Sequence, residues 1–394
     1  MNQPAAYRTD RVRSIDLLRG IIMIIMALDH VRDYIHVTAV TGNPTDLATT
    51  TIPLFLTRWI THFCAPLFVF LSGISAYLNS RRKTVPEMAA FLMKRGLWLV
   101  VADGLIISLV MTFNPTYSVI LLQVIWAIGW GMLILGLLLR AGYKAIAITG
   151  IVLFFGHNLT GLLQPLQGPS ATVSGILLTG PVIFTVAGKL LIMPYPILPW
   201  AGVMMLGFAF GKLFGRETEA AARRKKLLTS GVVLTALFLL LRFINIYGDP
   251  SPWSAQASAS FTVLSFLNVT KYPPSLQFCC MTIGPGLVML SLLDRWNGRL
   301  AGFLEVYGKV PFFYFLMHFL LIHLITVVLF FATGNSLRQA IDPSSIFLFR
   351  PANWGFGLGY TYLLWFIVVL LMYYPCRRYM RYKASHNYWW LSYV

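Results

Sequence analysis

The sequence predicts an all-α protein that crosses a lipid bilayer about ten times. Of its 394 residues, 57% are hydrophobic and 11% are charged, and the mean hydropathy is +0.71. A soluble domain usually carries roughly 25% charged residues. Apolar windows recur along the whole chain, and each has the roughly 20 residues that a membrane-spanning helix needs. These observations favour a polytopic helical bundle and leave no room for a large soluble domain.

We expect one transmembrane helix in each of ten apolar windows. An eleventh candidate, 175–192, contains Pro181 and Lys189 and is harder to interpret. It could be a crossing, a re-entrant piece or an interfacial helix, and the last two are favoured because a crossing would break the alternation of charged turns. The ten windows are 17–39, 53–79, 91–113, 117–139, 143–163, 194–215, 227–247, 275–293, 308–332 and 358–375.

The distribution of basic residues predicts the orientation of these helices. The chain has 31 Lys and Arg against 13 Asp and Glu, a net charge of +18. Most basic residues cluster at alternate turns, as the positive-inside rule requires if both termini are cytoplasmic. Orientation therefore explains the excess, and nucleic acid is not an expected partner. We predict a cytoplasmic segment 1–16, one transmembrane domain 17–375 and a cytoplasmic tail 376–394.

The first window carries ionisable side chains at membrane depth. Charged groups in a bilayer are costly, which makes them functional candidates. Arg19 and His30 are eleven residues apart, about three helical turns, and so share a helix face. The ionisable residues of this window are Asp16, Arg19, Asp29, His30, Arg32 and Asp33.

Other windows add polar side chains at mid or outer depth. Arg58 and His62 are four residues apart and share a face, Asp103 lies in the third window and His318 in the ninth. An imidazole beside a carboxylate suits proton transfer near neutral pH. Interhelical hydrogen bonding is an equally good interpretation of His62 and His318. No metal site is expected, because no acidic cluster accompanies the imidazoles.

Two segments resemble the catalytic domain of the heparan-α-glucosaminide N-acetyltransferase family and its bacterial members. They are Ser14-Ile-Asp-Leu-Leu-Arg-Gly-Ile21 and Ala65-Pro-Leu-Phe-Val-Phe-Leu-Ser-Gly-Ile-Ser-Ala76. The spacing of Arg19 and His30 is similar to the Arg-x10-His pattern of the wider membrane acyltransferase superfamily. Softer similarities are the late segment Gly308–His318 and the ending Trp389-Trp-Leu-Ser-Tyr393.

The resemblance implies transfer of an acetyl group from cytoplasmic acetyl-CoA to an amine or hydroxyl on the outer side, with a carbohydrate-type acceptor. It also implies a multi-pass location in a bacterial cytoplasmic membrane, and it leaves a homodimer open. His30, oriented by Asp29, would act as base or nucleophile. The lysosomal enzyme of the family has Asn at the position of His30 and uses a later histidine, so His36 is the alternative.

The expected binding residues form two groups. Basic residues toward the cytoplasmic side would hold acetyl-CoA, a polyanion: Arg19, Arg81, Arg82, Lys94 and Arg95. Polar residues of the outer half would contact the acceptor: Asp33, Arg58, His62, Asp103 and His318.

Two other functions are compatible with the residues alone. One is a proton-coupled transporter in which Asp29, His30 and Asp103 relay protons. The other is a non-catalytic membrane scaffold. The acyltransferase is favoured because the motifs of the first two windows match together.

Overall fold

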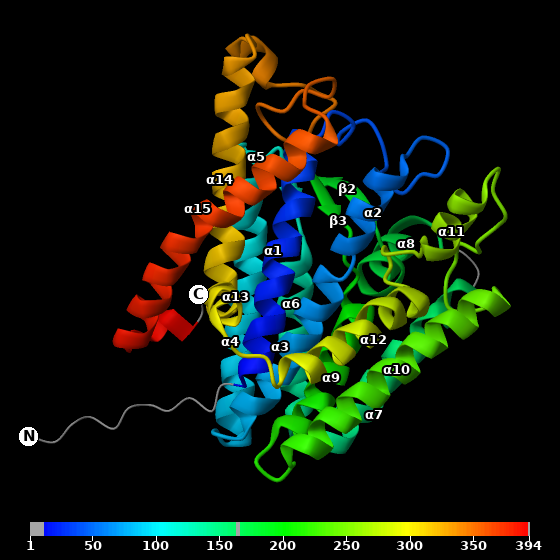
Figure 1. Ribbon diagram of the computed structural model, residues 1–394, viewed down its shortest axis with the longest axis vertical. Coiled ribbons are helices and arrows are strands. Elements are labelled where there is room, and N and C mark those ends of the chain that lie inside the picture. The colour runs from blue at the N-terminus through cyan, green and yellow to red at the C-terminus, as the bar shows by residue number, and fades with distance from the viewer. Residues whose placement is uncertain (1–11, 163–165, 393–394) are drawn as a thin grey trace, which may run out of the picture.

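The computed structural model describes residues 12–162 and 166–392, and 71% of the protein is helical. Figure 1 shows long helices around a central α1 (Arg13–Ile35). Eight segments are long and apolar enough to cross a membrane. α1 is also long enough, but three arginines and three aspartates interrupt it. The predicted helical membrane fold is thus confirmed in its broad class. The eight segments are Ile52–Ser80, Val85–Thr112, Val124–Gly161, Ile197–Phe214, Ala220–Ile244, Leu276–Leu293, Pro311–Ala332 and Leu358–Ser385.

Two of these segments are interrupted by a turn or a break between two helices. Segment Val124–Gly161 turns at Gly142, whose positive φ of 84° ends one helix before the next begins. Segment Ile52–Ser80 is broken at His62 and Phe63. Pro66 explains the break, because it lacks an N–H and its ring would clash with the carbonyl four residues earlier in a continuous helix. The four helices are α2 (Ile52–Thr61), α3 (Cys64–Ser80), α6 (Val124–Leu138) and α7 (Gly142–Gly156).

The region 175–192, predicted to be a re-entrant piece or an interfacial helix rather than a crossing, begins with a helical turn at Gly175–Thr179 and continues as a β-hairpin. β2 (Val182–Val186) pairs antiparallel with β3 (Lys189–Met193), and β3 pairs in parallel with β1 (Val119–Leu121). β-branched residues favour strands, and Ala187 and Gly188 take the positive φ values, 49° and 74°, of a tight hairpin turn. The expectation of an entirely helical fold was therefore wrong here. Strands of five residues are also shorter than the roughly 9–11 of a spanning strand.

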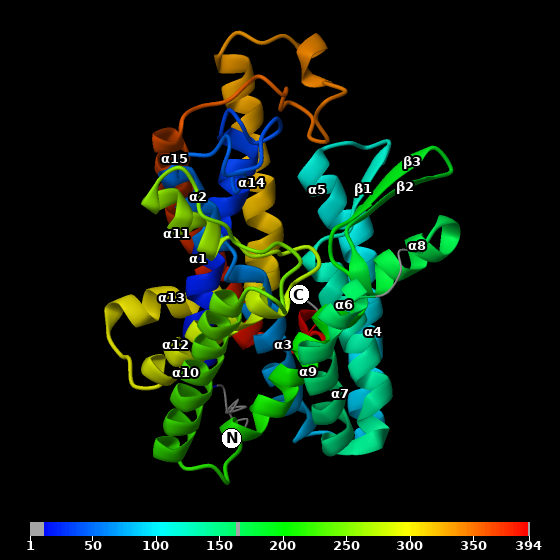
Figure 2. The same cartoon turned by 90° about the vertical axis from the view of Figure 1, so that its right-hand side faces the viewer.

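The long helices pack in pairs around α1. α3 lies along α9, α4 along α6, α7 along α9 and α10 along α12, while α1 packs on α13, α14 and α15. Figure 2 shows the hairpin beside α5, far from α10 and α13. α15 continues ten residues beyond the predicted end of its window at 375. The bounds of the other helices are α4 (Val85–Ala102), α5 (Ser108–Thr112), α8 (Gly168–Ser174), α9 (Ile197–Gly211), α10 (Ala220–Ile244), α11 (Ala259–Leu267), α12 (Leu276–Leu293), α13 (Arg299–Lys309), α14 (Pro311–Ala332) and α15 (Leu358–Ser385).

Basic turns gather at one end of the bundle. The turn between α3 and α4 and the turn between α9 and α10 lie at the lower end of Figure 1. The loops 36–51 and 333–357 lie at the upper end. Arg81, Arg82, Lys83 and Arg216 belong to the lower turns. The arrangement agrees with alternating charge along the chain.

Small residues bring α3 and α9 into backbone contact. A Cβ at Gly73 would lie 1.9 Å from the Met204 carbonyl oxygen. A Cβ at Gly207 would lie 2.1 Å from that of Phe70. Such close approach is typical of helix packing in membranes.

We expect Gly73→Val to separate α3 from α9 and to lower stability by about 1–3 kcal/mol, the usual cost of overpacking. Thermal unfolding of the purified protein, followed by tryptophan fluorescence, measures the change. Gly302→Val is the matched control, because nothing lies within 4 Å of a Cβ at that exposed helical position. Equal melting temperatures for the two variants would contradict the close contact.

Candidate functional site

His30 on α1 faces His318 on α14. The His30 Nδ1 and His318 Nε2 atoms are 2.7 Å apart. The His30 ring stacks on Phe319, with ring centres 4.0 Å apart, and meets Phe315 edge-on at 6.1 Å. His30 is half-buried, whereas His318 is fully buried. The His30 side chain thus retains some exposed surface, whereas His318 has none.

The Asp29 carboxylate is held by arginines. It accepts a hydrogen bond from Arg32, at 3.0 Å, and another from Arg58 of α2. Arg32 also pairs with Asp33 at 2.6 Å. The prediction that Asp29 orients His30 was therefore wrong. Successive side chains on a helix point about 100° apart, so the carboxylate reaches α2 while the imidazole reaches α14.

A lysine from a loop joins this group. Lys271 is close enough to Asp29, His30 and His62 to interact with them electrostatically. It precedes α12, and its ammonium group lies 5.1 Å from the ring centre of Tyr272. His62, at the end of α2, is buried, and its Nδ1 has no hydrogen-bond partner among the described residues. The structure thus places Arg58 on Asp29, with His62 and Lys271 within electrostatic range, and sequence reasoning did not select Lys271.

Two predicted residues lie outside this group. His36 follows the end of α1, and its Nδ1 is 3.0 Å from the Thr38 hydroxyl. Burial and the charges of Arg32 and Arg350 lower the pKa of His36, which favours its neutral form. Asp103 accepts hydrogen bonds from the backbone N–H groups of Gln123, at 2.6 Å, and Trp126, at 2.8 Å.

Asp103 therefore caps the start of α6 and has a structural role. The sequence interpretation that grouped it with the acceptor site was wrong, since its hydrogen bonds are with α6 rather than with the His30 group. A proton relay through Asp29, His30 and Asp103 loses its support for the same reason.

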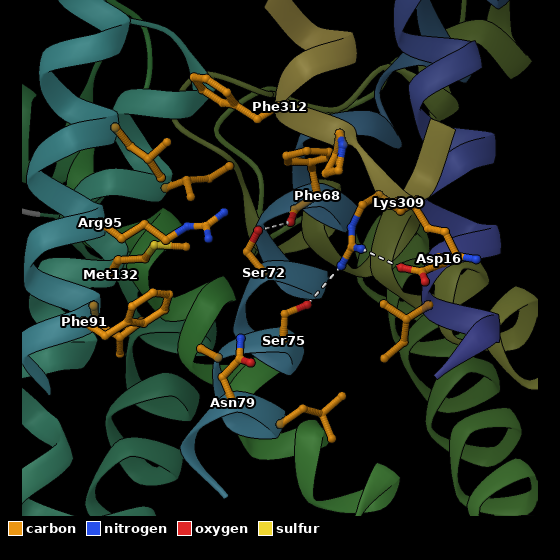
Figure 3. A pocket seen from close by; sticks show the side chains of 18 of the residues that line it. Asp16, Phe68, Ser72, Ser75, Asn79, Phe91, Arg95, Met132, Lys309 and Phe312 are labelled. Atoms are coloured by element: carbon orange, nitrogen blue, oxygen red, sulfur yellow. Dashed lines mark hydrogen bonds and ion pairs between the residues drawn. The ribbon is translucent and has the colours of Figure 1, made fainter. Parts of the chain in front are cut away.

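A cavity of about 510 Å³ opens nearer the start of α1. Figure 3 shows Ser72 and Ser75 of α3 between two walls, one with Arg95 and Met132 and the other with Asp16 and Lys309. Arg19 bridges the cavity wall by donating to Asp16 at 3.0 Å and to the Ser75 hydroxyl at 2.9 Å. Both predicted roles of Arg19, holding the helix to Asp16 and facing the donor site, are compatible with this position.

The charged lining of the cavity is mainly basic. Arg19, Arg82 and Arg95 were selected from the sequence, whereas Arg81 and Lys94 do not line the cavity. Arg81 forms a two-point ion pair with Glu217, with bonds of 2.6 and 3.0 Å, and Lys94 is exposed. Sequence reasoning did not select two lysines that also line the cavity, Lys309 and Lys383. The five basic side chains of the lining are Arg19, Arg82, Arg95, Lys309 and Lys383.

Among residues 12–162 and 166–392, no three His, Cys, Asp or Glu side chains gather closely enough to hold a metal ion.

The geometry can be compared with known families. The sequence profile described as heparan-alpha-glucosaminide N-acetyltransferase, catalytic, matches residues 11–242, more than half of the chain. The chain belongs to this family. No curated protein matches the chain. Membership in the heparan-alpha-glucosaminide N-acetyltransferase family confirms the resemblance and indicates a membrane acetyltransferase.

The matched region contains His30, the broken helix and the three arginines of the cavity. His318, Lys271, Lys309 and Lys383 lie beyond it. Both candidate sites are therefore completed by the part of the chain that follows the match.

Proposed function

We propose that this protein transfers an acetyl group from acetyl-CoA, bound in the basic cavity, to an amine or hydroxyl of a carbohydrate-type acceptor at His30. The observation that carries the proposal is the position of both sites on α1. Arg19 lines the cavity and His30 lies eleven residues further, about 16 Å along the same helix face. A long, narrow donor with an anionic head and a reactive tip can span this distance.

The cavity suits the phosphate groups of CoA. Arginine forms strong, often two-point hydrogen bonds with phosphate, and both Arg82 and Arg95 line the cavity. The face of α3 that lines the cavity presents Phe68, Ser72, Ser75 and Asn79, spaced as one helical stripe. Its serines offer hydroxyls to the amide groups of a pantetheine arm. Phe68 lies at the end of this stripe that is nearer to the start of α3.

The proposed chemistry uses His30 as general base. The acceptor nitrogen or oxygen attacks the thioester carbonyl carbon, and His30 Nε2 takes the acceptor's proton. The carbon–sulfur bond then breaks, the thiolate leaves with the bonding pair, and the imidazolium returns the proton to sulfur. Acetyl-CoA and the acceptor thereby become the acetylated acceptor and CoA. General-base catalysis of this kind accelerates reactions roughly 10²–10⁴-fold.

The membrane arrangement follows from the same proposal. Counting α1 and taking α6 and α7 as separate crossings gives ten transmembrane helices, with both termini on the cytoplasmic side. The basic turns and the cavity then face the cytoplasm, where acetyl-CoA is made, and the loops 36–51 and 333–357 face outward. A bacterial cytoplasmic membrane is the setting that this orientation predicts.

Release of CoA from acetyl-CoA by the purified protein tests the proposal. Glucosamine offers an amine and hydroxyls, whereas N-acetylglucosamine offers hydroxyls alone. We expect acceptor-dependent thiol release, with mass spectrometry showing the acetylated sugar and thereby separating N- from O-acetylation. A protein that binds neither acetyl-CoA nor acceptor, or that releases CoA at the same rate without acceptor, would contradict the proposal.

A further inference from the structure

His318 of the His30–His318 pair is also hydrogen-bonded to a backbone carbonyl. His318 Nδ1 is 2.8 Å from the carbonyl oxygen of Tyr314, one turn earlier on α14. A carbonyl oxygen only accepts hydrogen bonds, so His318 Nδ1 must carry a hydrogen and donate it. The protonation of one nitrogen of His318 is thus assigned from its hydrogen-bond partner.

The protonation state of the other His318 nitrogen, Nε2, follows from the burial of the side chain. His318 is fully buried at membrane depth, and no carboxylate pairs with it among the described residues. A charged imidazolium without an acidic partner is costly there. His318 is therefore neutral, and its Nε2 carries a lone pair. Because that atom can only accept, His30 Nδ1 must donate the hydrogen of the 2.7 Å contact.

We propose that His318 is a positioning residue that fixes the tautomer of His30, with the hydrogen on Nδ1 and the lone pair on Nε2. The lone pair is then available on the nitrogen that faces away from His318. Phe319 and Phe315 hold the plane of the ring, by stacking and by an edge contact. The inference rests on the proposed function for its catalytic meaning, whereas the tautomer itself is a property of the resting protein.

In this pair, His318 orients the His30 ring and stabilises its imidazolium form, as a carboxylate does for the catalytic histidine of many hydrolases. When His30 Nε2 takes a proton from the acceptor, the ring becomes an imidazolium with hydrogens on both nitrogens. His318 Nε2 accepts the hydrogen bond from Nδ1, and the face of Phe319 lies over the new positive charge. No proton leaves the pair until His30 returns one from Nε2 to the thiolate.

Solid-state ¹⁵N NMR of histidine-labelled protein in lipid bilayers tests the tautomer. Nitrogens with and without hydrogen have well-separated shifts, and subtraction of a His30→Asn spectrum assigns the His30 signals among the seven histidines. We expect a protonated Nδ1 and an unprotonated Nε2 for His30. His318→Gln keeps this pattern because the Gln carbonyl accepts the same hydrogen bond, whereas His318→Phe loses it. A wild-type His30 with hydrogen on Nε2 would overturn the assignment.

Kinetics tests the positioning role. His318→Phe should lower kcat about 100-fold with little change in either KM, and His318→Gln should recover activity to within about tenfold. His323→Phe is the matched control on the same helix, since His323 is also fully buried but stacks on Phe113 and lies beside the Val110 and Leu348 carbonyls. Its kcat per folded molecule should be unchanged.

The two experiments separate failure of the inference from failure of the function. If no acceptor supports CoA release, the proposed function fails while the NMR pattern still decides the tautomer. If the protein is active and His318→Phe keeps full kcat, the positioning role is wrong. Equal losses in His318→Gln and His318→Phe would also overturn it.

Discussion

His30→Ala is expected to lower acceptor-dependent CoA release by about 10²–10⁴-fold, because it removes the proposed base while the donor cavity stays intact. The KM for acetyl-CoA should change little, since Arg19 and the rest of the cavity lie about 16 Å away along α1. The measurement is steady-state thiol release, with the melting temperature of each variant as a check on folding.

His36→Ala is the informative comparison, because both histidines lie in the outer half of the first predicted window, 17–39. His36 lies beyond the end of α1 and bonds to Thr38, so we expect near-normal activity. Full activity in His30→Ala together with a large loss in His36→Ala would transfer the catalytic role to His36.

The second large effect is expected in the cavity. Replacing both Arg82 and Arg95 by Gln should raise the KM for acetyl-CoA about 10- to 100-fold and leave kcat nearly unchanged. Hydrogen bonds to charged groups contribute about 1.5–3 kcal/mol each. Losing them weakens binding of the donor equally in the ground state and in the transition state, so KM rises while kcat stays the same. The KM of the wild-type enzyme should also rise with ionic strength, because salt screens such interactions.

The controls for this prediction are neighbours in the sequence. Arg81 pairs with Glu217, and Lys94 is exposed, and neither lines the cavity. The double variant Arg81→Gln, Lys94→Gln removes the same net charge from the same end of the protein. Equal increases in KM for the two double variants would show that general surface charge, rather than the cavity, attracts the donor.

The helical membrane fold could be predicted because composition and apolar length determine it. The hairpin at β2 and β3 could not, since a short apolar run reads alike as helix or strand when only hydropathy is considered. The break before α3 had a visible cause in Pro66. The break was overlooked because the window 53–79 is long and apolar enough on average for one continuous crossing.

The candidate site was predicted only in part, because the sequence shows which residues are ionisable but not which of them pair. Arg19, His30 and Arg58 stand out because ionisable groups are rare in apolar windows. Which groups pair cannot be read from one sequence, so Asp29 was assigned to His30 rather than to Arg58. Lys271 lies in a loop, and Lys383 lies near the end of α15; basic residues are common in both places. Only the packing of distant helices brings Lys271 near the His30 group and Lys383 to the cavity.

The central claim is that the basic cavity and His30 belong to one reaction path, and a cryo-EM map of the protein with bound CoA tests it most directly. We predict phosphate density between Arg82 and Arg95, a pantetheine arm along Ser75 and Ser72, and the sulfur atom beyond Phe68 on the side of His30. CoA bound outside the cavity, or bound in it with the sulfur directed away from His30, would contradict the account.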